Sequence, residues 1–329
     1  MKSLLKFVKD WMLPVAMVFG ISSYLLFRYV PVLQPMEKHW ITFASDIQPF
    51  LIFSMLFLQF VKVSPHDLGL RKWHIVLMLV QTLIFTGLGA IATLLPEGGA
   101  AKILVECFML CLICPTATAA GVITDKLGGS LPAVMSYTVL INCVVSIVIP
   151  LMAPVVNPID GFSFWQSFVQ IISKVFSILI LPCAVAWTIR YTTKRLQRWL
   201  MKYVGAAFYI WAVSLALALS LATQSLIDSK LSFWLTLGIA VVSFIGCISQ
   251  FAIGRKVAKK LGRCESLSAG QAMGQKNTGF FIWIGFSFFN PVTSIAGGFY
   301  AIWHNIVNSY ELYLMRKNNI PTRQYTDLD

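Results

Sequence analysis

The sequence predicts an all-α, polytopic membrane protein with ten transmembrane helices. Of its 329 residues, 57% are hydrophobic and only 12% are charged, and the mean hydropathy is +0.75. A soluble domain is about a quarter charged, so this composition indicates that lipid surrounds most of the chain. Apolar stretches of roughly 20 residues, the length that crosses a bilayer, recur along nearly the whole sequence.

These stretches define the expected elements in order. The first follows a basic segment that has no small-residue cleavage site, so we interpret it as a membrane helix and not as a removed signal peptide. Ten spans divide into two sets of five that cross the bilayer in opposite senses, with residues 1–160 as the first inverted repeat and 161–329 as the second. The expected spans are about 11–29, 44–63, 74–95, 103–123, 131–155, 165–189, 204–224, 232–253, 266–288 and 294–315.

The basic residues predict the orientation. The net charge of +13 does not indicate a nucleic-acid partner, because 20 of the 26 Lys and Arg lie on alternate connections. Lys and Arg mark cytoplasmic loops, so we expect both termini in the cytoplasm of a cell (inner) membrane protein. The opposite side holds Arg28, Lys38, Lys102 and Lys230. The cytoplasmic set is Lys2, Lys6, Lys9, Lys62, Arg71, Lys72, Lys126, Arg190, Lys194, Arg195, Arg198, Lys202, Arg255, Lys256, Lys259, Lys260, Arg263, Arg316, Lys317 and Arg323.

Two spans at corresponding places in the halves contain helix breakers. The fourth carries "CPTATAAG" (114–121) and the ninth carries "GQKNTG" (274–279). Proline removes a backbone donor and disturbs the preceding turn, and unwound backbone is tolerated in a membrane only inside protein or beside a wet cavity. We therefore predict that helices 4 and 9 are discontinuous and cross at their breaks. Gly270 and Gly274 form a small-xxx-small pair that favours close helix packing.

Several motifs together resemble the bile acid:sodium symporter family. They are "CPTATAAGVITDKLGG" (114–129), "GQKNTGFF" (274–281), "AIWHNIVNS" (301–309), "KVSPHDL" (62–68) and Gln81 within "LVQTLIF". The resemblance implies a core domain and a panel domain that are interleaved across both halves. It also implies transport of organic anions, either bile-acid-like or other small carboxylates, by alternating access. In that family two sodium ions bind beside the crossing and drive symport.

The sequence departs from the family where sodium would bind. The family's Ser-Asn pair in span four is here Ala120 and Gly121, its Glu in span nine is Ala272, and its Gln is Lys276, although Asn277 and Gln81 remain. Sodium requires several oxygen ligands, so we expect no sodium site and no other metal or cofactor. In the family, one carboxylate and two sodium ions leave a single net positive charge. Lys276 alone supplies the same charge, so we interpret it as a substitute for bound sodium.

Three roles remain open for Lys276. A lysine that loses its proton during the cycle would couple transport to protons. A lysine that stays charged would make the protein an uncoupled carrier or an exchanger. A lysine that snorkels or pairs with a backbone carbonyl would be structural. We expect Gln275, Asn277, Thr116 and Thr118 to lie at the same crossing and the two threonines to line a cavity. His304 and Asn305 are secondary candidates, in a span where polar groups often join helices.

A soft-ligand cluster offers a different function. Cys107, Cys111 and Cys114 share one helical face, and three thiols could carry a trivalent arsenic species in an arsenite-type efflux carrier. Buried cysteine also serves as a small hydrophobe. The remaining alternative is a non-transporting membrane receptor. No acid–base pair or metal cluster is visible within the spans, so we do not expect an enzyme. The expected partners are a small organic anion and the lipid bilayer, and the sequence does not define the oligomeric state.

Overall fold

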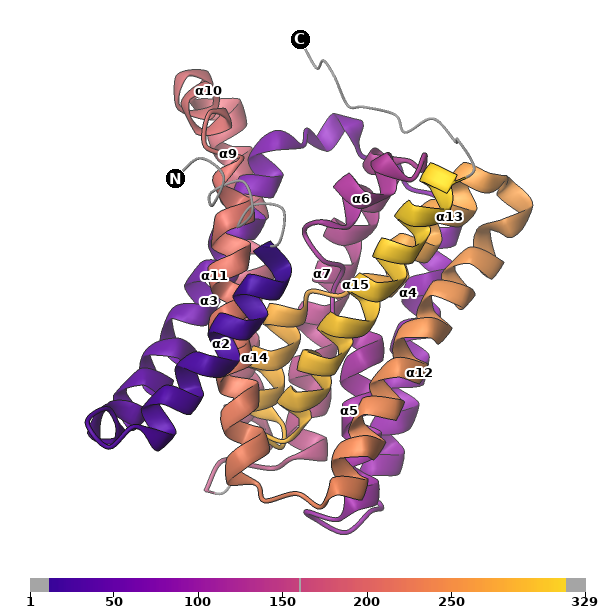
Figure 1. Cartoon of the computed structure of the whole chain (residues 1–329). Helices are drawn as coiled ribbons and strands as arrows, with labels where there is room; N and C mark the ends of the chain where they lie inside the picture. The colour runs from indigo at the N-terminus through magenta and orange to yellow at the C-terminus, as the bar shows by residue number, and fades with distance from the viewer. Residues whose placement is uncertain (1–11, 160, 318–329) are drawn as a thin grey trace.

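A computed structural model describes residues 12–159 and 161–317, and in this part the chain is helical with no named strand (Figure 1). The α-helices are α2 (Met12–Tyr29), α3 (Glu37–Lys62), α4 (Lys72–Ala92), α5 (Ala100–Ile113), α6 (Ala120–Lys126), α7 (Leu131–Val156), α8 (Phe164–Leu179), α9 (Leu181–Thr192), α10 (Lys194–Met201), α11 (Ala206–Asp228), α12 (Phe233–Ala258), α13 (Arg263–Gly274), α14 (Thr278–Phe288) and α15 (Thr293–Lys317). Short 3-10 helices are η1 (Gln34–Met36), η2 (Pro65–Asp67) and η3 (Lys259–Leu261).

Five of these helical segments are long and apolar enough to cross a membrane, and they indicate a membrane-embedded protein. They are Gln34–Lys62, Lys72–Ala92, Leu131–Val156, Ala206–Asp228 and Phe233–Leu261. The pair α8 and α9, bent by 42°, makes a sixth when counted as one span. The pieces of the two broken helices are too short to qualify singly, at 14, 7, 12 and 11 residues. Ten spans in two inverted repeats therefore stay a prediction.

The helices pack as two groups. In the first, which we call the α11 group, α11 packs against α2 and α3, and α3 packs against α9. In the second, the crossing group, α12 packs against α5, α13 and α15, and α7 packs against α4, α6 and α13. Helix α14 packs against α15 and also meets α3 and α11, while α8 packs against α7, α3 and α9. Each group draws helices from both halves of the chain (Figure 1).

The predicted orientation depends partly on residues outside the described ranges. Lys2, Lys6, Lys9, Arg323 and both chain ends lie there. Among the described residues, the end of α6, the start of α13 and the helix α10 lie at one end of the molecule, and the α4–α5 and α11–α12 connections lie at the other (Figure 1). The cytoplasmic placement of the first end stays a prediction.

Small residues allow α12 and α13 to approach closely, as the Gly270–Gly274 spacing predicts. A Cβ atom at Gly254 would lie 2.4 Å from the backbone oxygen of Ala269, and one at Gly274 would lie 2.4 Å from the ring of Phe251. A Cβ at Gly270 would lie 2.6 Å from the side chain of Arg255. Glycine is required here by close contact, which fixes the position of the broken helix α13 against the continuous helix α12.

Replacing Gly254 with alanine is expected to destabilise the protein by about 1–3 kcal/mol, because a methyl group would meet backbone that cannot move without shifting α13. The matched control is Gly87→Ala in α4, where no atom lies within 4 Å of the added Cβ and alanine should stabilise the helix by up to about 1 kcal/mol. Thermal unfolding of the two purified variants measures the difference. Equal melting temperatures would contradict the close-packing argument.

Candidate functional site at the crossing of two broken helices

Both predicted breaks are confirmed, and the broken segments pair with each other. The first break separates α5 from α6 and the second separates α13 from α14. At their centre Thr116 and Lys276 form an isolated antiparallel bridge. Two backbone hydrogen bonds hold it, from Ala117 N–H to Gln275 O and from Asn277 N–H to Pro115 O, each at 2.8 Å. The crossing is therefore a short ladder between two extended segments.

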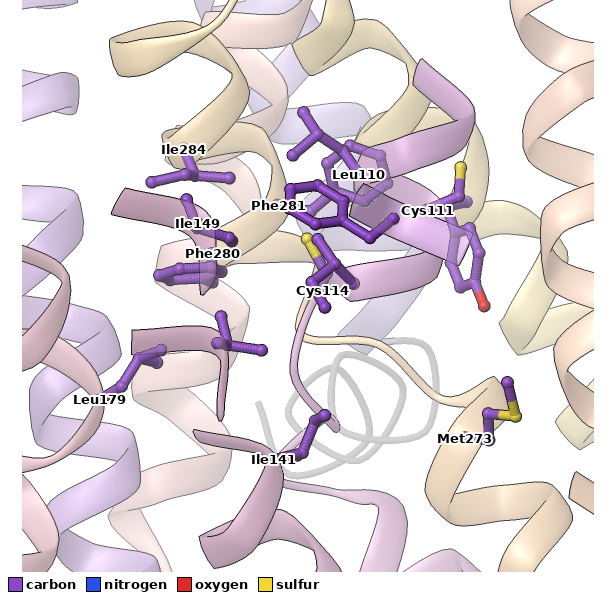
Figure 2. Close-up of a cluster of buried hydrophobic side chains, with 14 of the residues drawn as sticks. Leu110, Cys111, Cys114, Ile141, Ile149, Leu179, Met273, Phe280, Phe281 and Ile284 are labelled. Atoms are coloured by element: carbon purple, nitrogen blue, oxygen red, sulfur yellow. The ribbon is translucent and has the colours of Figure 1, made fainter. Parts of the chain in front are cut away.

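The surroundings of the crossing are apolar and closely packed. Figure 2 shows side chains from α5, α7, α8, α13 and α14 gathered around the two extended segments. All of them are buried, and they include Leu110, Cys111, Cys114, Ile141, Ile149, Leu179, Met273, Phe280, Phe281 and Ile284. In such surroundings the last carbonyl groups of each half-helix must find partners within the protein.

Side chains from neighbouring helices satisfy the carbonyl groups at the end of α5. The oxygen of Leu112 accepts from Lys276 Nζ at 2.9 Å and from Gln81 Nε2 at 2.5 Å. The oxygen of Cys111 accepts from Gln250 Nε2 at 2.8 Å. The structure thus brings Lys276 and Gln81 to one acceptor, although 195 residues separate them in sequence (276 − 81).

The end of α13 is satisfied in the same way. The oxygen of Ala272 accepts from Thr116 Oγ1 at 2.7 Å, and the oxygen of Gly274 accepts from the hydroxyl of Tyr300 at 2.8 Å. Gln250 also donates to the Tyr300 hydroxyl at 3.0 Å, so one continuous network links both broken helices to α12 and α15. Gln250 and Tyr300 were not among the predicted site residues. An amide in the middle of the apolar stretch "CISQFAIG" is the signal that identifies Gln250.

Lys276 is 1% exposed, which excludes snorkelling to the membrane surface. Its ammonium lies at the C-terminal end of α5, where the helix dipole is negative. The interpretation in which Lys276 pairs with a backbone carbonyl therefore agrees with the geometry. That contact also holds the lysine amine at the crossing, where the sodium-substitute interpretation requires it, so the two roles are compatible.

The other predicted residues lie in and around the break. Thr116 was expected to line a cavity, but this is wrong, because it is 1% exposed and its hydroxyl joins the two helices. Thr118 is half-buried, and Ala120 and Ala272 are fully buried. At Gly121 a Cβ would lie 3.2 Å from the sulfur of Met135, so apolar packing fills the space beside it.

Gln275 starts a second polar chain that leads away from the crossing. Its amide donates to Gln271 Oε1, whose own amide donates to Glu311 Oε2 at 2.7 Å, and Glu311 pairs with Arg255. On α15, Asn305 donates to the carbonyl of Ala301 on its own helix at 2.7 Å. His304 packs against the ring of Tyr300, and its Nδ1 is buried without a partner. Of these two candidates, only His304 approaches the network.

The start of α14 is the point where the crossing meets the α11 group. Asn277 caps α14, since its Oδ1 accepts from Phe280 N–H at 3.1 Å, but its Nδ2 is buried without a partner. Across from it, Gln48 of α3 donates to Ser214 of α11 at 2.9 Å, and Gln48 Oε1 is also unpartnered. A Cβ at Gly279 would lie 3.1 Å from the amide of Gln48 and 3.2 Å from the hydroxyl of Ser214. Sequence reasoning missed Gln48 and Ser214, although an amide before Pro49 within an apolar span was a visible signal.

The three thiols in the last turns of α5 and at its C-terminal cap do not form a metal site. Cys107, Cys111 and Cys114 are buried and free, and Cys111 packs against Gly246 of α12. Within residues 12–159 and 161–317, no group of three or more His, Cys, Asp or Glu side chains could hold a metal ion. The geometry that an arsenite-type carrier needs is therefore not present among these residues.

The fold and the site define a class: a membrane-embedded helical protein with two broken helices that pair at a buried crossing, which contains a lysine. No protein-family model matches the chain, and no curated protein matches its sequence. The resemblance to the bile acid:sodium symporter family therefore stays a prediction that rests on the motifs themselves.

Proposed function

We propose that this protein is a ten-span secondary transporter that moves a small organic anion by alternating access without sodium. The observation that carries the proposal is the pairing of two interrupted helices around one buried cation. Interrupted helices are a recurrent way to build a substrate site near the middle of a bilayer, because the half-helix ends offer unpaired backbone groups and aligned dipoles there. A purely structural helix would avoid both the break and the charge.

The start of α14 is the proposed anion contact. A helix N-terminus favours negative charge, and α14 is 11 residues long. The unpartnered Nδ2 of Asn277 supplies a further donor beside it, and the unpartnered Oε1 of Gln48 can accept from a hydroxyl of the substrate. Asn277 and Gln48 belong to different helix groups, so a substrate held between them would connect the groups during transport.

Lys276 supplies a permanent charge in this proposal. The carbonyl of Leu112 and the C-terminal end of α5 both favour its protonated form. A charge that stays in place carries no ion across the membrane, so we propose an exchanger or an uncoupled carrier. Proton coupling is the second mechanism, and it requires that Lys276 release its proton as the groups move.

A polar stripe on α8 supports a water-filled route through the protein. Its members recur at helical spacing on one face of a membrane span and are exposed: Gln166, Gln170, Ser173, Lys174 and Ser177. Within a membrane span, exposed amide and ammonium groups require water or protein partners, not lipid. Lys174 Nζ also lies 5.5 Å from the centre of the Phe288 ring at the end of α14. We propose that this stripe borders the route along which the anion reaches the start of α14.

Cysteine labelling tests the polar stripe. In a background that lacks the exposed Cys143 and Cys264, Ser173→Cys and Ser177→Cys should react with a charged, membrane-impermeant thiol reagent, because thiolate forms only where water reaches. Phe176→Cys is the matched control, since Phe176 is also exposed but lies outside the stripe. Equal labelling at all three positions, or none at Ser173 and Ser177, would contradict a water-filled route.

Ligand binding followed by flux tests the function itself. Thermal unfolding of purified protein is measured against aliphatic, aromatic and bile-acid carboxylates, since any native-state ligand raises apparent stability. The best stabiliser is then radiolabelled and its uptake into liposomes is measured with sodium or with choline as the cation. We expect equal uptake in both. Binding without flux in either direction would identify a receptor, and uptake that requires sodium would overturn the proposed coupling.

A further inference from the structure

We infer that the bend between α9 and α10 is a binding site for the phosphate of an anionic phospholipid headgroup. The site is separate from the crossing and does not depend on the transport proposal. Helix α9 ends at Thr192, and Thr193 leaves helical geometry with φ −133° and ψ 76° before α10 begins. At this bend a hollow of about 430 Å³ is lined by Arg190, Lys194, Gln197 and Arg198.

The lining residues form one stripe that carries three positive charges. Lys194, Gln197 and Arg198 follow the i, i+3, i+4 spacing that aligns side chains on one face of α10, and Arg190 joins them from the last turn of α9. Arg190 is half-buried and donates to the carbonyl of Val61 at 3.4 Å, which holds it against the end of α3. Lys194 and Arg198 are exposed. The stripe therefore combines one anchored guanidinium with two cations that can close around a ligand.

Among the described residues, no ion pair neutralises this charge. The sequence contains no Asp or Glu between Asp160 and Asp228. The ion pairs of the described residues involve Arg28, Arg71, Lys102 and Arg255, and none involves the residues of the hollow. Arginine binds phosphate oxygens through two parallel N–H groups. A zwitterionic headgroup has the same phosphodiester, but its own ammonium group offsets that charge, so three uncompensated cations favour a headgroup without an ammonium. The hollow is thus suited to a phosphodiester with net negative charge.

The opposite face of α10 identifies the source of that phosphate as a lipid. Leu196 and Trp199 are exposed there. Tyr203, exposed just beyond the end of α10, has its ring 4.8 Å from that of Trp199. Tryptophan and tyrosine concentrate at the membrane interface, and a helix with one basic and one apolar face lies in that plane. Figure 1 shows α10 beyond the end of α9, at an end of the helix bundle. The hollow would therefore stand at the level of the headgroups.

Gln197 and the neighbouring cations extend the recognition beyond one phosphate. The Gln197 amide, half-buried in the lining, can bond to a headgroup hydroxyl next to the phosphate. Arg195 and Lys202 are exposed nearby and add to the positive potential. Phosphatidylglycerol, which has one phosphodiester and two free hydroxyls, is the probe whose chemistry fits this arrangement.

The test measures phosphatidylglycerol binding to the full-length protein. Short-chain phosphatidylglycerol is titrated into protein in neutral detergent, and bound lipid is counted by native mass spectrometry. The test variant is Arg190→Gln/Lys194→Gln/Arg198→Gln. The control is Lys256→Gln/Lys259→Gln/Lys260→Gln, which removes the same charge from an exposed part of the α12–η3 segment. We expect the test variant to bind roughly 100-fold more weakly and the control to bind like wild type.

A second variant and a soluble competitor complete the design. Lys194→Gln/Arg198→Gln leaves the anchored Arg190 contact intact, so a weakened interaction in this variant cannot reflect misfolding around Val61. Equal losses in the test and control variants would show a general charge effect and overturn the site. Displacement of phosphatidylglycerol by millimolar inorganic phosphate would show a site for a soluble phosphate and would overturn the lipid assignment.

Discussion

Lys276→Met is expected to abolish anion transport while leaving the protein folded. Methionine has a similar length and no charge, so the variant removes the buried ammonium alone. A unit charge several Å from a bound anion contributes about 2–4 kcal/mol at an effective dielectric constant of about 20, so flux should fall roughly 100-fold or more. The melting temperature should change little, because Gln81 still donates to the Leu112 oxygen and the desolvation penalty of a buried charge is removed.

Gln81→Leu is the matched control, and it should behave in the opposite way. It removes the second donor to Leu112 O and leaves Lys276 in place, and the buried Tyr137 hydroxyl loses its acceptor. Leaving a buried hydroxyl unpaired costs about 1–3 kcal/mol, so the melting temperature should drop while the flux per folded molecule changes less than in Lys276→Met. If Lys276→Met retained normal flux, the proposed role of the charge would be refuted, whatever its stability.

Sodium dependence is expected to appear when two of the four altered ligands of the resembled family are returned beside the retained Gln81 and Asn277. Ala272→Glu/Lys276→Gln restores a carboxylate and an amide one turn apart at the end of α13, and both positions are buried against α5 and its break. In this variant sodium should raise the free energy of unfolding by about 2.7 kcal/mol at 100 times its Kd. Wild type should show no such effect, because neither Ala272 nor Lys276 offers an oxygen ligand.

Ala272→Gln/Lys276→Gln separates ion binding from repacking. Glutamine has the size of glutamate but no charge. Any destabilisation caused by the added volume at position 272 should therefore be the same in this variant as in Ala272→Glu/Lys276→Gln. Thermal unfolding in sodium and in choline, with transport assayed alongside, should show a sodium response in the glutamate variant only. A sodium response in wild type would mean that the residue comparison at Ala272 and Lys276 is misaligned.

The sequence predicted the breaks and the charge at the crossing but not the partners. Pro115 and the glycines of "GQKNTG" locate the breaks because they disturb helix geometry directly. The contact between Lys276 and Leu112 could not be predicted, since a backbone carbonyl has no sequence signature. Thr116 was misplaced for the same reason: a hydroxyl beside a break can face a cavity or a carbonyl, and only the approach of α13 decides between them.

Polar residues inside apolar spans indicate site residues that were not among those predicted. Gln48 and Gln250 occupy key positions, one facing α14 and the other holding the end of α5. Each is an amide within a membrane-spanning helix, which is rare without a partner. The structure yields fewer spans than the sequence predicts for two reasons. The broken helices divide a hydrophobic stretch into pieces too short to cross a bilayer alone, and the continuous helices α2 and α15 are not among those long and apolar enough to cross.

The distribution of carbonyl partners determines what can move. The groups that bond to Cys111, Leu112, Ala272 and Gly274 all come from α4, α12, α15 or the breaks themselves, and within the described residues none of these four acceptors is bonded by the α11 group. The crossing could thus tilt as a rigid body, with its internal bonds intact, while sliding past α3 and α11. The activation barrier of such a rocking step would then come from side-chain contacts between the groups, both at Gly279 and where Ser294 of α15 donates to Ser225 of α11 at 3.1 Å.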